Sequence, residues 1–482
     1  MFKQFSLNTV YRLVGFIIGF FLSVIIARKL GSDEYGIFAI FLTIGGLISG
    51  IGMFGFPDYI IKNISITRSI NNKILFVFLN SLFVILILIL LFHIFENNIY
   101  CIFNIETVQI ESNLYFIGYI VFVTLNVFLR SIFEGFHNSQ NGYLIKEVFG
   151  RLFKLLPFLI LKITLKNVFT IFFLAEFLVF IIFIGLIYYK FDIDIDKKKR
   201  LLSKKDIKKI YQYTMPLFAT SLVLIFNGQI IKLLLGSFEA AKYVGYYDIS
   251  LNFASLMIIG LNIQNTVLKP YFSKFFQEVN LHGVQKYYSQ SSKILTLISL
   301  PIGLLFLGFP KLFLMFYGSG FYEAKIILQL VIISSIINIS TGSNYPILVM
   351  SKISYKEFNA NILNFASVIL LGTIFIYAFG YIGAGLILIL SQTIVNVYRI
   401  IVLNKEYGLK PFHNMLSTYS LLFTSVVIIM LLSNVMSNSI MYLVPILLFI
   451  ILTTCYLFIK IEFHSGEIKE YYFMLKEKIL LK

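Results

Sequence analysis

The chain has 482 residues, of which 59% are hydrophobic and only 13% are charged, and its mean hydropathy is +0.88. A soluble protein of this length needs far more surface charge, so the composition excludes a soluble globular fold and predicts a membrane protein. We interpret the net charge of +17 as a signal of membrane topology and as a contact surface for anionic lipid, with no nucleic-acid partner.

Apolar segments long enough to cross a bilayer follow one another along the whole chain. A crossing needs about 20 apolar residues, and we find about 14 such segments. The fifth, residues 148–165, is the weakest because charged residues and a proline interrupt it. The segments are centred near Gly19, Gly46, Ile85, Val123, Pro157, Val179, Ile225, Leu256, Ser299, Ser335, Leu370, Leu390, Val427 and Leu448. The sequence therefore predicts an all-α polytopic membrane protein.

The distribution of basic residues predicts the orientation. An even number of spans puts both termini on one side of the membrane. If that side is the cytoplasm, about four-fifths of the 40 Lys and Arg residues lie there, as the positive-inside rule requires. We therefore expect both termini to be cytoplasmic.

A basic segment between the sixth and seventh spans divides the chain. It contains Lys197-Lys198-Lys199-Arg200 and four further lysines up to Lys209. We predict a cytoplasmic linker at 191–213 that includes an amphipathic helix on the membrane surface. Six spans then form a first lobe, 1–190, and six form a second lobe, 214–405. Two more spans and a cytoplasmic tail occupy 406–482.

Two stretches far apart in the chain read almost alike. Ile25–Ser32 and Ile230–Ser237 both end on Leu-Gly-Ser. After a polar turn, the apolar sequence resumes at Gly36 in the first copy and at Gly245 in the second. Internal duplication of this kind is typical of secondary transporters and predicts two related halves.

Span one carries small residues at every fourth position: Gly15, Gly19, Ser23 and Ala27. This spacing puts all four on one face, where another helix backbone can come close. We interpret the stripe as a helix-packing surface.

Ionisable residues within spans are costly, about 2.5–3.5 kcal/mol at the bilayer centre, and usually face a partner or a wet cavity. Glu176 in span six is either a buried partner or an ion-coupling group. Lys232, near the outer end of span seven, either extends toward the interface or contacts substrate. Asp248, early in span eight, is a candidate partner for Lys232.

Further polar side chains suit a phosphorylated sugar. Arg12, Arg28 and Arg130 lie near span ends, where long side chains normally reach the interface, but guanidinium also suits two-point contact with phosphate. Amides gather in spans seven and eight and indicate a hydrated lumen that favours sugar hydroxyls: Asn227, Gln229, Asn262, Gln264 and Asn265.

No enzyme signature is present. The five histidines have no metal-ligand or catalytic spacing, and no predicted external loop exceeds about 20 residues. The glycines from Gly45 to Gly55 lack the lysine of a phosphate-binding loop. We expect neither catalytic residues nor a metal site nor a bound cofactor.

Four short motifs, in this order, carry a family resemblance: Ala27-Arg28-Lys29-Leu30-Gly31-Ser32-Asp33-Glu34-Tyr35-Gly36, Leu235-Gly236 with Val244-Gly245-Tyr246-Tyr247, Val267-Leu268-Lys269-Pro270-Tyr271-Phe272-Ser273, and Gly380-Tyr381-Ile382-Gly383-Ala384-Gly385. With about 14 spans, they resemble the polysaccharide biosynthesis flippases, the Wzx-type O-antigen transporters of the multidrug/oligosaccharidyl-lipid/polysaccharide (MOP) exporter superfamily.

The resemblance implies two pseudo-symmetric six-helix lobes around a central cavity, plus two C-terminal helices. It implies a flippase that moves an undecaprenyl-pyrophosphate-linked oligosaccharide, an O-antigen or capsular repeat unit, across the bacterial inner membrane by alternating access. The partners expected are the lipid-linked oligosaccharide, the bilayer and polysaccharide assembly proteins, with the monomer as the functional unit. Its cavity is expected to be cationic, with these candidates: Arg12, Arg28, Arg130, Lys232 and Lys269.

One departure from the family pattern concerns ion coupling. Many members carry an aspartate just before the Leu-Gly of span seven, where this chain has Ile231-Lys232. If transport is coupled to a proton or sodium gradient, we therefore expect Glu176 or Asp248 to be the coupling residue.

Three alternatives remain open. A lipid-II or teichoic acid flippase shares the fold and mechanism. A MATE-like multidrug exporter shares the fold but is expected to have a more acidic, aromatic cavity. An O-antigen polymerase usually has a long outer loop rich in basic residues and histidine, which is not found here.

Overall fold

The computed structural model describes residues 2–105, 113–191, 193–194, 202–435 and 440–463. Nearly all of them are helical, which confirms the all-α prediction. The elements up to residue 238 are α1 (Phe2–Met53), α2 (Phe56–Thr67), β1 (Ile70–Asn71), α3 (Asn72–Ile94), α4 (Glu96–Ile102), α5 (Asn113–Gly135), α6 (Ser139–Tyr143), the π-helix η2 (Leu144–Phe149), α7 (Gly150–Ile160), α8 (Leu165–Lys190), β2 (Ile193–Asp194) and α9 (Lys204–Phe238).

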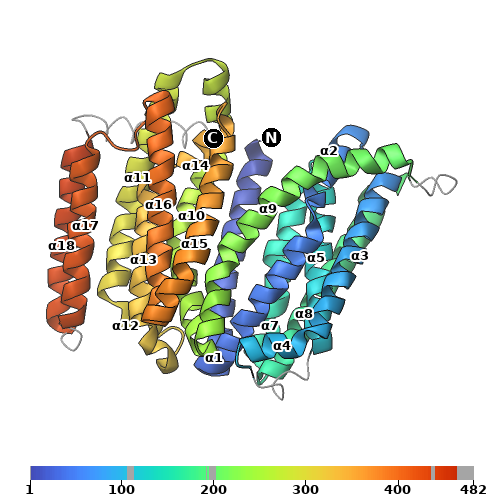
Figure 1. Ribbon diagram of the computed structural model, residues 1–482, viewed down its shortest axis with the longest axis horizontal. Coiled ribbons are helices and arrows are strands. Elements are labelled where there is room, and N and C mark those ends of the chain that lie inside the picture. Colours follow the sequence, from blue (N-terminus) through green and yellow to red (C-terminus); the bar gives the residue numbers. More distant parts are fainter. Residues whose placement is uncertain (1, 106–112, 192, 195–201, 436–439, 464–482) are drawn as a thin grey trace. The chain divides into compact units, whose positions relative to one another are not determined.

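The remaining elements, shown in Figure 1, are α10 (Ala241–Gln277), α11 (Leu281–Gly308), α12 (Pro310–Leu314), the 3-10 helix η3 (Ser319–Ala324), α13 (Lys325–Ser340), α14 (Asn344–Met350), α15 (Tyr355–Phe379), α16 (Tyr381–Tyr407), α17 (Met415–Val435) and α18 (Ile440–Glu462).

The prediction of about 14 spans is confirmed. Among the described residues, 12 helices are long and apolar enough to cross a membrane. One of them, α1, contains two predicted spans, because Gly31 (φ 77°, ψ 178°) interrupts its helical geometry. The fifth predicted span is the run of α6, η2 and α7, none of which alone is long enough to cross a membrane.

By internal contacts the chain divides into two compact units. The first contains the chain up to Ile249 together with Phe316–Glu323 and Val368–Ala384. The second contains Ser250–Met315, Ala324–Ser367 and the chain from Gly385 on. The predicted lobes, 1–190 and 214–405, stay a prediction.

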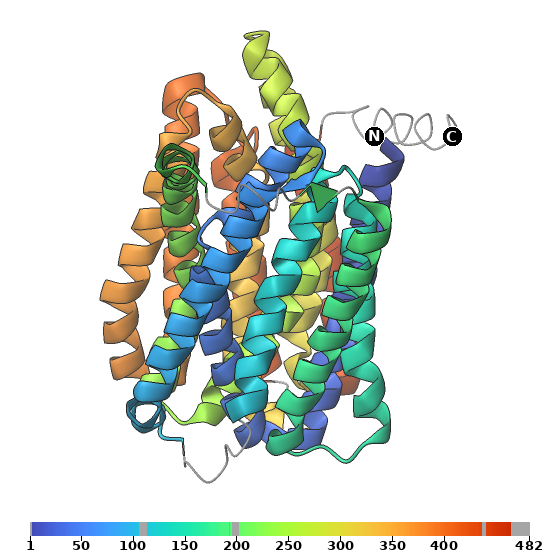
Figure 2. The same ribbon diagram turned by 90° about the vertical axis from the view of Figure 1, so that its right-hand side faces the viewer.

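The core of the first unit forms where α2, α5 and α8 pack together. Aromatic side chains from all three helices are fully buried there, including Phe56, Phe128, Phe133 and Phe183. Figure 2 shows α3, α5 and α8 side by side in this unit. The two short strands pair in parallel, Ile70 with Ile193 and Asn71 with Asp194, and so bring residues from distant parts of the chain together.

The linker prediction is only partly covered by the structure. The run Lys197–Arg200 lies outside the described residues. The helix expected at 191–213 begins at Lys204, after the N-cap Ser203, and continues without a break into span seven as α9. Figure 1 shows that α9 is bent, and it contains Pro216, whose ring disrupts regular helix geometry.

The near-repeats differ in geometry but touch one another within the first unit. The first copy turns at Gly31 inside α1, whereas the second ends α9 at Phe238, before α10 starts at Ala241. A Cβ atom added to Gly245 would lie 3.2 Å from the Cα of Gly36. The two glycines at which the apolar sequence resumes therefore allow α1 and the start of α10 to approach backbone to backbone.

In the second unit, α11 packs on α13, α17 and α18, and α17 packs on α18. A further apolar cluster joins α10, α11, α14 and α16 through buried residues such as Phe272, Tyr288, Leu348 and Leu403.

Candidate functional site

Two of the predicted phosphate-binding arginines meet in the first unit. Arg12 on α1 donates a hydrogen bond to the hydroxyl of Tyr143 on α6, and its guanidinium carbon lies 4.3 Å from the ring centroid. The guanidinium carbon of Arg130, on α5, lies 5.1 Å from the same ring. Tyr143 therefore holds Arg12 and Arg130 beside each other by cation–π contact.

A third arginine, Arg151 on α7, joins this group through Glu147 on η2. Arg151 Nη2 lies 2.8 Å from Glu147 Oε2, and Arg130 Nη1 lies 3.7 Å from Glu147 Oε1. Arg130 also pairs with Glu134 on its own helix, Nε to Oε1 at 3.0 Å. We call Arg12, Arg130, Arg151, Tyr143, Glu134 and Glu147 the arginine cluster.

The small-residue stripe of span one makes room for the cluster. A Cβ atom added to Gly15 would lie 2.6 Å from the carbonyl oxygen of Glu147, and one added to Gly19 would lie 2.9 Å from Nη1 of Arg151. The Gly15 carbonyl oxygen accepts a hydrogen bond of 2.5 Å from Arg151 Nη1. The Gly15 and Gly19 part of the stripe thus packs, as predicted, against η2 and α7.

The cluster keeps an excess of positive charge, because three guanidinium groups face two carboxylates. Its side chains are partly exposed, 23% for Arg130, 33% for Arg151 and 19% for Glu147. Guanidinium groups in a partly desolvated site are well suited to two-point contact with phosphate or carboxylate. The cluster therefore has the chemistry of an anion-binding site.

Arg28 lies near the opposite end of the first half of α1. Its Nε donates a hydrogen bond of 2.6 Å to the carbonyl oxygen of Phe316. The neighbouring Lys29 donates one of 2.7 Å to the carbonyl oxygen of Leu161. The structure does not bring Arg28 into the arginine cluster.

Lys232 and Asp248 form an ion pair between α9 and α10, as predicted. The hydroxyl of Tyr35 donates a hydrogen bond of 2.8 Å to Asp248 Oδ2. Tyr35 immediately precedes Gly36, and Asp248 follows Gly245 by three residues. Residues beside the two glycines at which the apolar sequence resumes are therefore hydrogen-bonded to each other.

Glu176, on α8, has a buried ionic partner. Its Oε1 lies 2.6 Å from the Nζ of Lys154 on α7, and its Oε2 accepts a hydrogen bond of 2.7 Å from Asn126 on α5. Glu176 is 4% exposed and Lys154 is 9% exposed. The interruption of span five by Lys154, which weakened that span in the hydropathy pattern, is thus compensated by a charge in span six.

The predicted sugar-contact amides lie in both units. Asn227 and Gln229 are on α9 in the first unit, and Asn262, Gln264 and Asn265 are on α10 in the second. Three of their buried polar atoms have no hydrogen-bond partner in the described part of the chain: Gln229 Oε1, Gln264 Nε2 and Asn265 Oδ1. Buried amide atoms normally have hydrogen-bond partners, so these three atoms are exceptions.

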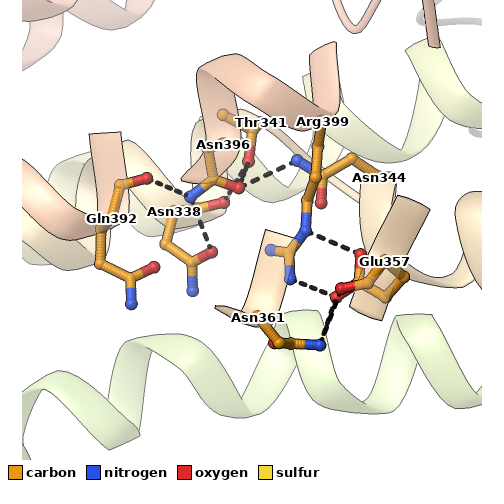
Figure 3. A network of polar contacts seen from close by, with 8 residues as sticks. All are labelled: Asn338, Thr341, Asn344, Glu357, Asn361, Gln392, Asn396 and Arg399. Atoms are coloured by element: carbon orange, nitrogen blue, oxygen red, sulfur yellow. Dashed lines mark hydrogen bonds and ion pairs between the residues drawn. The ribbon is translucent and has the colours of Figure 1, made fainter. Parts of the chain in front are cut away.

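Lys269 lies in the second unit, where its Nζ is 5.1 Å from the ring centroid of Tyr345. The same ring lies 5.9 Å from the guanidinium carbon of Arg399. Arg399 forms a bidentate ion pair with Glu357, at 3.0 Å and 2.5 Å, that sequence analysis did not identify (Figure 3).

A second group of polar contacts surrounds Asn396, which lies one helical turn before Arg399 on α16. Its Oδ1 accepts hydrogen bonds of 2.9 Å from both Thr341 and Asn344 (Figure 3). Asn396 and Thr341 also line a mainly apolar cavity of about 480 Å³ between α13, α16 and α17. This part of the second unit is a polar network next to an apolar cavity.

Sequence analysis missed Arg151, Glu134, Glu147 and Tyr143 as members of a site. Arg151 and Lys154 had been interpreted only as interruptions of span five. The signal that could have found the cluster is the i,i+4 spacing of Arg130 with Glu134 and of Glu147 with Arg151. The meeting of Arg12 with Arg130 has no signal in the local sequence.

The fold defines a multi-pass α-helical membrane protein. The family described as polysaccharide biosynthesis protein matches residues 1–276, more than half of the sequence. The chain belongs to this family. No curated protein matches it.

The chain shares its fold with solved structures of a lipid flippase and of MATE transporters. A lipid II flippase, MurJ, in an inward closed conformation has a TM-score of 0.68 and 15% identity, covering 94% of this chain and 99% of its own. An inward-facing MATE multidrug resistance transporter has a TM-score of 0.62 and 13% identity, covering 83% and 98%. The Vibrio cholerae MATE transporter VcmN in its bent form has a TM-score of 0.57 and 13% identity, covering 84% and 96%.

The family match confirms the predicted resemblance to polysaccharide biosynthesis proteins, and the solved structures confirm the fold that this resemblance implies. By their names, these solved structures are a flippase and two transporters. The described residues contain no group of three or more His, Cys, Asp or Glu side chains able to hold a metal ion.

Proposed function

We propose that this protein moves an undecaprenyl-pyrophosphate-linked oligosaccharide, an O-antigen or capsular repeat unit, from the inner to the outer leaflet of the bacterial cytoplasmic membrane. The observation that carries the proposal is the convergence of Arg12, Arg130 and Arg151 from three helices. A pyrophosphate cannot enter a membrane protein without cationic contacts, and guanidinium offers it paired N–H donors.

The position of the arginine cluster supports loading from the cytoplasm. Arg12 lies near the start of α1, Arg130 near the end of α5, and Arg151 near the start of α7. If both termini are cytoplasmic, Arg12 and Arg130 lie toward the inner ends of their helices, and Arg151 meets them from α7. A lipid-linked sugar made in the cytoplasm would meet the cluster first, while its polyprenyl chain stays in the bilayer.

The carboxylates proposed for coupling to a proton or sodium gradient are both paired. Glu176 contacts Lys154, and Asp248 contacts Lys232. A coupling ion acts at such a carboxylate by competing with its lysine. We propose coupling through one of these pairs, with the monomer as the functional unit beside polysaccharide assembly proteins.

Lipid-II and teichoic acid flippases share this chemistry and differ only in cargo, so they remain the closest alternatives. The larger share of this chain covered by MurJ, 94% against 83% and 84% for the two MATE transporters, favours a flippase over a drug exporter. The three clustered arginines also disfavour a cavity for cationic drugs, because they would repel the cargo.

The proposal is tested with the full chain in vesicles and a fluorescent polyprenyl-pyrophosphate oligosaccharide. Arg130→Lys and Arg151→Lys keep the charge but lose two-point contact, and we expect each to slow flipping about tenfold. Lys162→Gln, an exposed cation of the same unit, is the control and should flip at the wild-type rate. Export of a cationic dye without movement of any lipid-linked sugar would contradict the proposal.

A further inference from the structure

Glu147 occupies the place in the arginine cluster where an anionic ligand would be expected. Its two carboxylate oxygens face two different guanidinium groups, Arg151 at 2.8 Å and Arg130 at 3.7 Å. These arginines come from α7 and α5, so Glu147 joins helices that are separate in the sequence. The longer of the two contacts is at the limit of an ion pair and leaves Arg130 only loosely held by Glu147.

Two uncommon local features meet at Glu147. It lies in η2, a six-residue π-helix, a rare conformation that occurs often at functional sites. The facing residue on α1 is Gly15, where a Cβ atom would approach the Glu147 Cβ to 2.9 Å. A regular helix, or any side chain at position 15, would move this carboxylate away from its present place.

A carboxylate and a phosphate present the same feature to guanidinium, paired oxygens that accept parallel N–H bonds. The two anions would therefore compete for Arg130 and Arg151. The exposed fractions of the three side chains, from 19% to 33%, leave them accessible from outside the protein. A buried carboxylate without access would instead act only as a structural ion pair.

We propose that Glu147 is an exchangeable counter-anion: it neutralises Arg130 and Arg151 while the cluster is empty, and the pyrophosphate of the cargo displaces it. This inference rests on the proposed function. When the pyrophosphate leaves, Glu147 returns to the arginines and lowers the free energy of the empty cluster. Glu147 thus weakens cargo binding and speeds cargo release, which is the balance that a transporter needs.

The test measures binding of undecaprenyl pyrophosphate to the full chain in detergent, and flipping in vesicles. Glu147→Gln removes the charge but keeps the shape, so we expect about tenfold tighter binding and a lower maximal flipping rate. Glu134→Gln should show a smaller gain in affinity, because Glu134 contacts only Arg130. Glu278→Gln, which removes an exposed i,i+4 partner of Lys274 in the second unit, is the matched control and should change neither quantity.

A second variant guards against loss of folding. Glu147→Asp keeps the charge on a shorter side chain, and we expect an affinity between those of the wild type and Glu147→Gln. If the wild type binds the lipid and both Glu147 variants bind it as tightly as the wild type or more weakly, the counter-anion role of Glu147 is wrong. The flippase proposal would still stand. If neither wild type nor the variants bind undecaprenyl pyrophosphate, both the counter-anion and the proposed function are wrong.

Discussion

At the scale of single residues, the charges inside the spans are compensated by partners on other helices. Glu176 with Lys154, Glu357 with Arg399, and Asp248 with Lys232 each join two helices. In a low-dielectric interior a lone charge is costly, so each pair constrains how its two helices pack. The arginine cluster differs from these pairs because positive charge is left over, which is why we assign cargo binding to the cluster and not to the pairs.

Loss of the Lys154 ammonium should destabilise the first unit. Lys154→Met leaves Glu176 buried and unpaired, and we expect a loss of about 3–5 kcal/mol in the free energy of unfolding. The double variant Lys154→Met/Glu176→Gln removes both charges and should recover much of that loss. Thermal unfolding in detergent checks both variants. Equal stability of the single and double variants would show that the pair contributes nothing.

Substitution of Gly15 should also be destabilising. In Gly15→Ala the new methyl group would lie 2.6 Å from the Glu147 carbonyl oxygen, which is backbone and cannot move aside cheaply. We expect a loss of about 1–3 kcal/mol, measured by thermal unfolding. Gly185→Ala is the matched control, because its added methyl group meets no atom within 4 Å. A Gly15→Ala protein as stable as the control would refute the close approach.

At the scale of elements, the segment 316–323 has an unusual place. It packs within the first unit, although the chain on both sides of it belongs to the second. Tyr317 and Phe321 are almost fully buried there, and the Tyr317 hydroxyl lies 2.9 Å from the Ser23 hydroxyl on α1. The segment is therefore attached to α1, although the residues before and after it in the sequence belong to the second unit.

A disulfide should lock this segment. A Cβ atom at Gly320 would lie 3.8 Å from the Cβ of Ser32, the usual separation in a disulfide. In a background with Cys101 and Cys455 replaced, Ser32→Cys/Gly320→Cys should cross-link under mild oxidation. If the segment must leave α1 during transport, oxidation should stop flipping and a reductant should restore it. Each single variant serves as a control, and full activity of the cross-linked protein would rule out this movement.

At the scale of the whole molecule, the positive-inside pattern predicts the sidedness of every loop. Lys162 lies between α7 and α8, and Lys352 lies between α14 and α15. With both termini cytoplasmic, Lys162 faces outward and Lys352 faces inward, and both side chains are exposed. We therefore expect the two positions to respond oppositely to a probe that cannot cross the membrane.

Cysteine labelling in intact cells tests this orientation. In a background without native cysteines, Lys162→Cys should react with an impermeant maleimide added outside. Lys352→Cys should react only after the membrane is permeabilised. The reverse pattern would invert the proposed topology and would put the arginine cluster at the outer surface.

Much of the fold could be predicted because a bilayer imposes a local rule, about 20 apolar residues per crossing. Even span five was located near Pro157, although Arg151 and Lys154 obscured it. The pairing of Lys232 with Asp248 was also predicted, since the two lie at adjacent ends of consecutive helices. The sequence did not predict that the linker helix and span seven form one helix, α9. Hydropathy does not show whether a surface helix continues into the next span.

The sequence by itself determined the membrane class, the number of spans, the family and the stripe of small residues on span one. Each of these depends on hydropathy, spacing or short motifs within a continuous stretch. Only the tertiary structure decided which charges meet. Arg12, Arg130 and Arg151 lie on three helices, and their convergence on Tyr143 and Glu147 depends on how α1, α5 and η2 pack. That packing depends on Gly15 and on a π-helical turn. No local sequence pattern predicts how these two features position distant side chains.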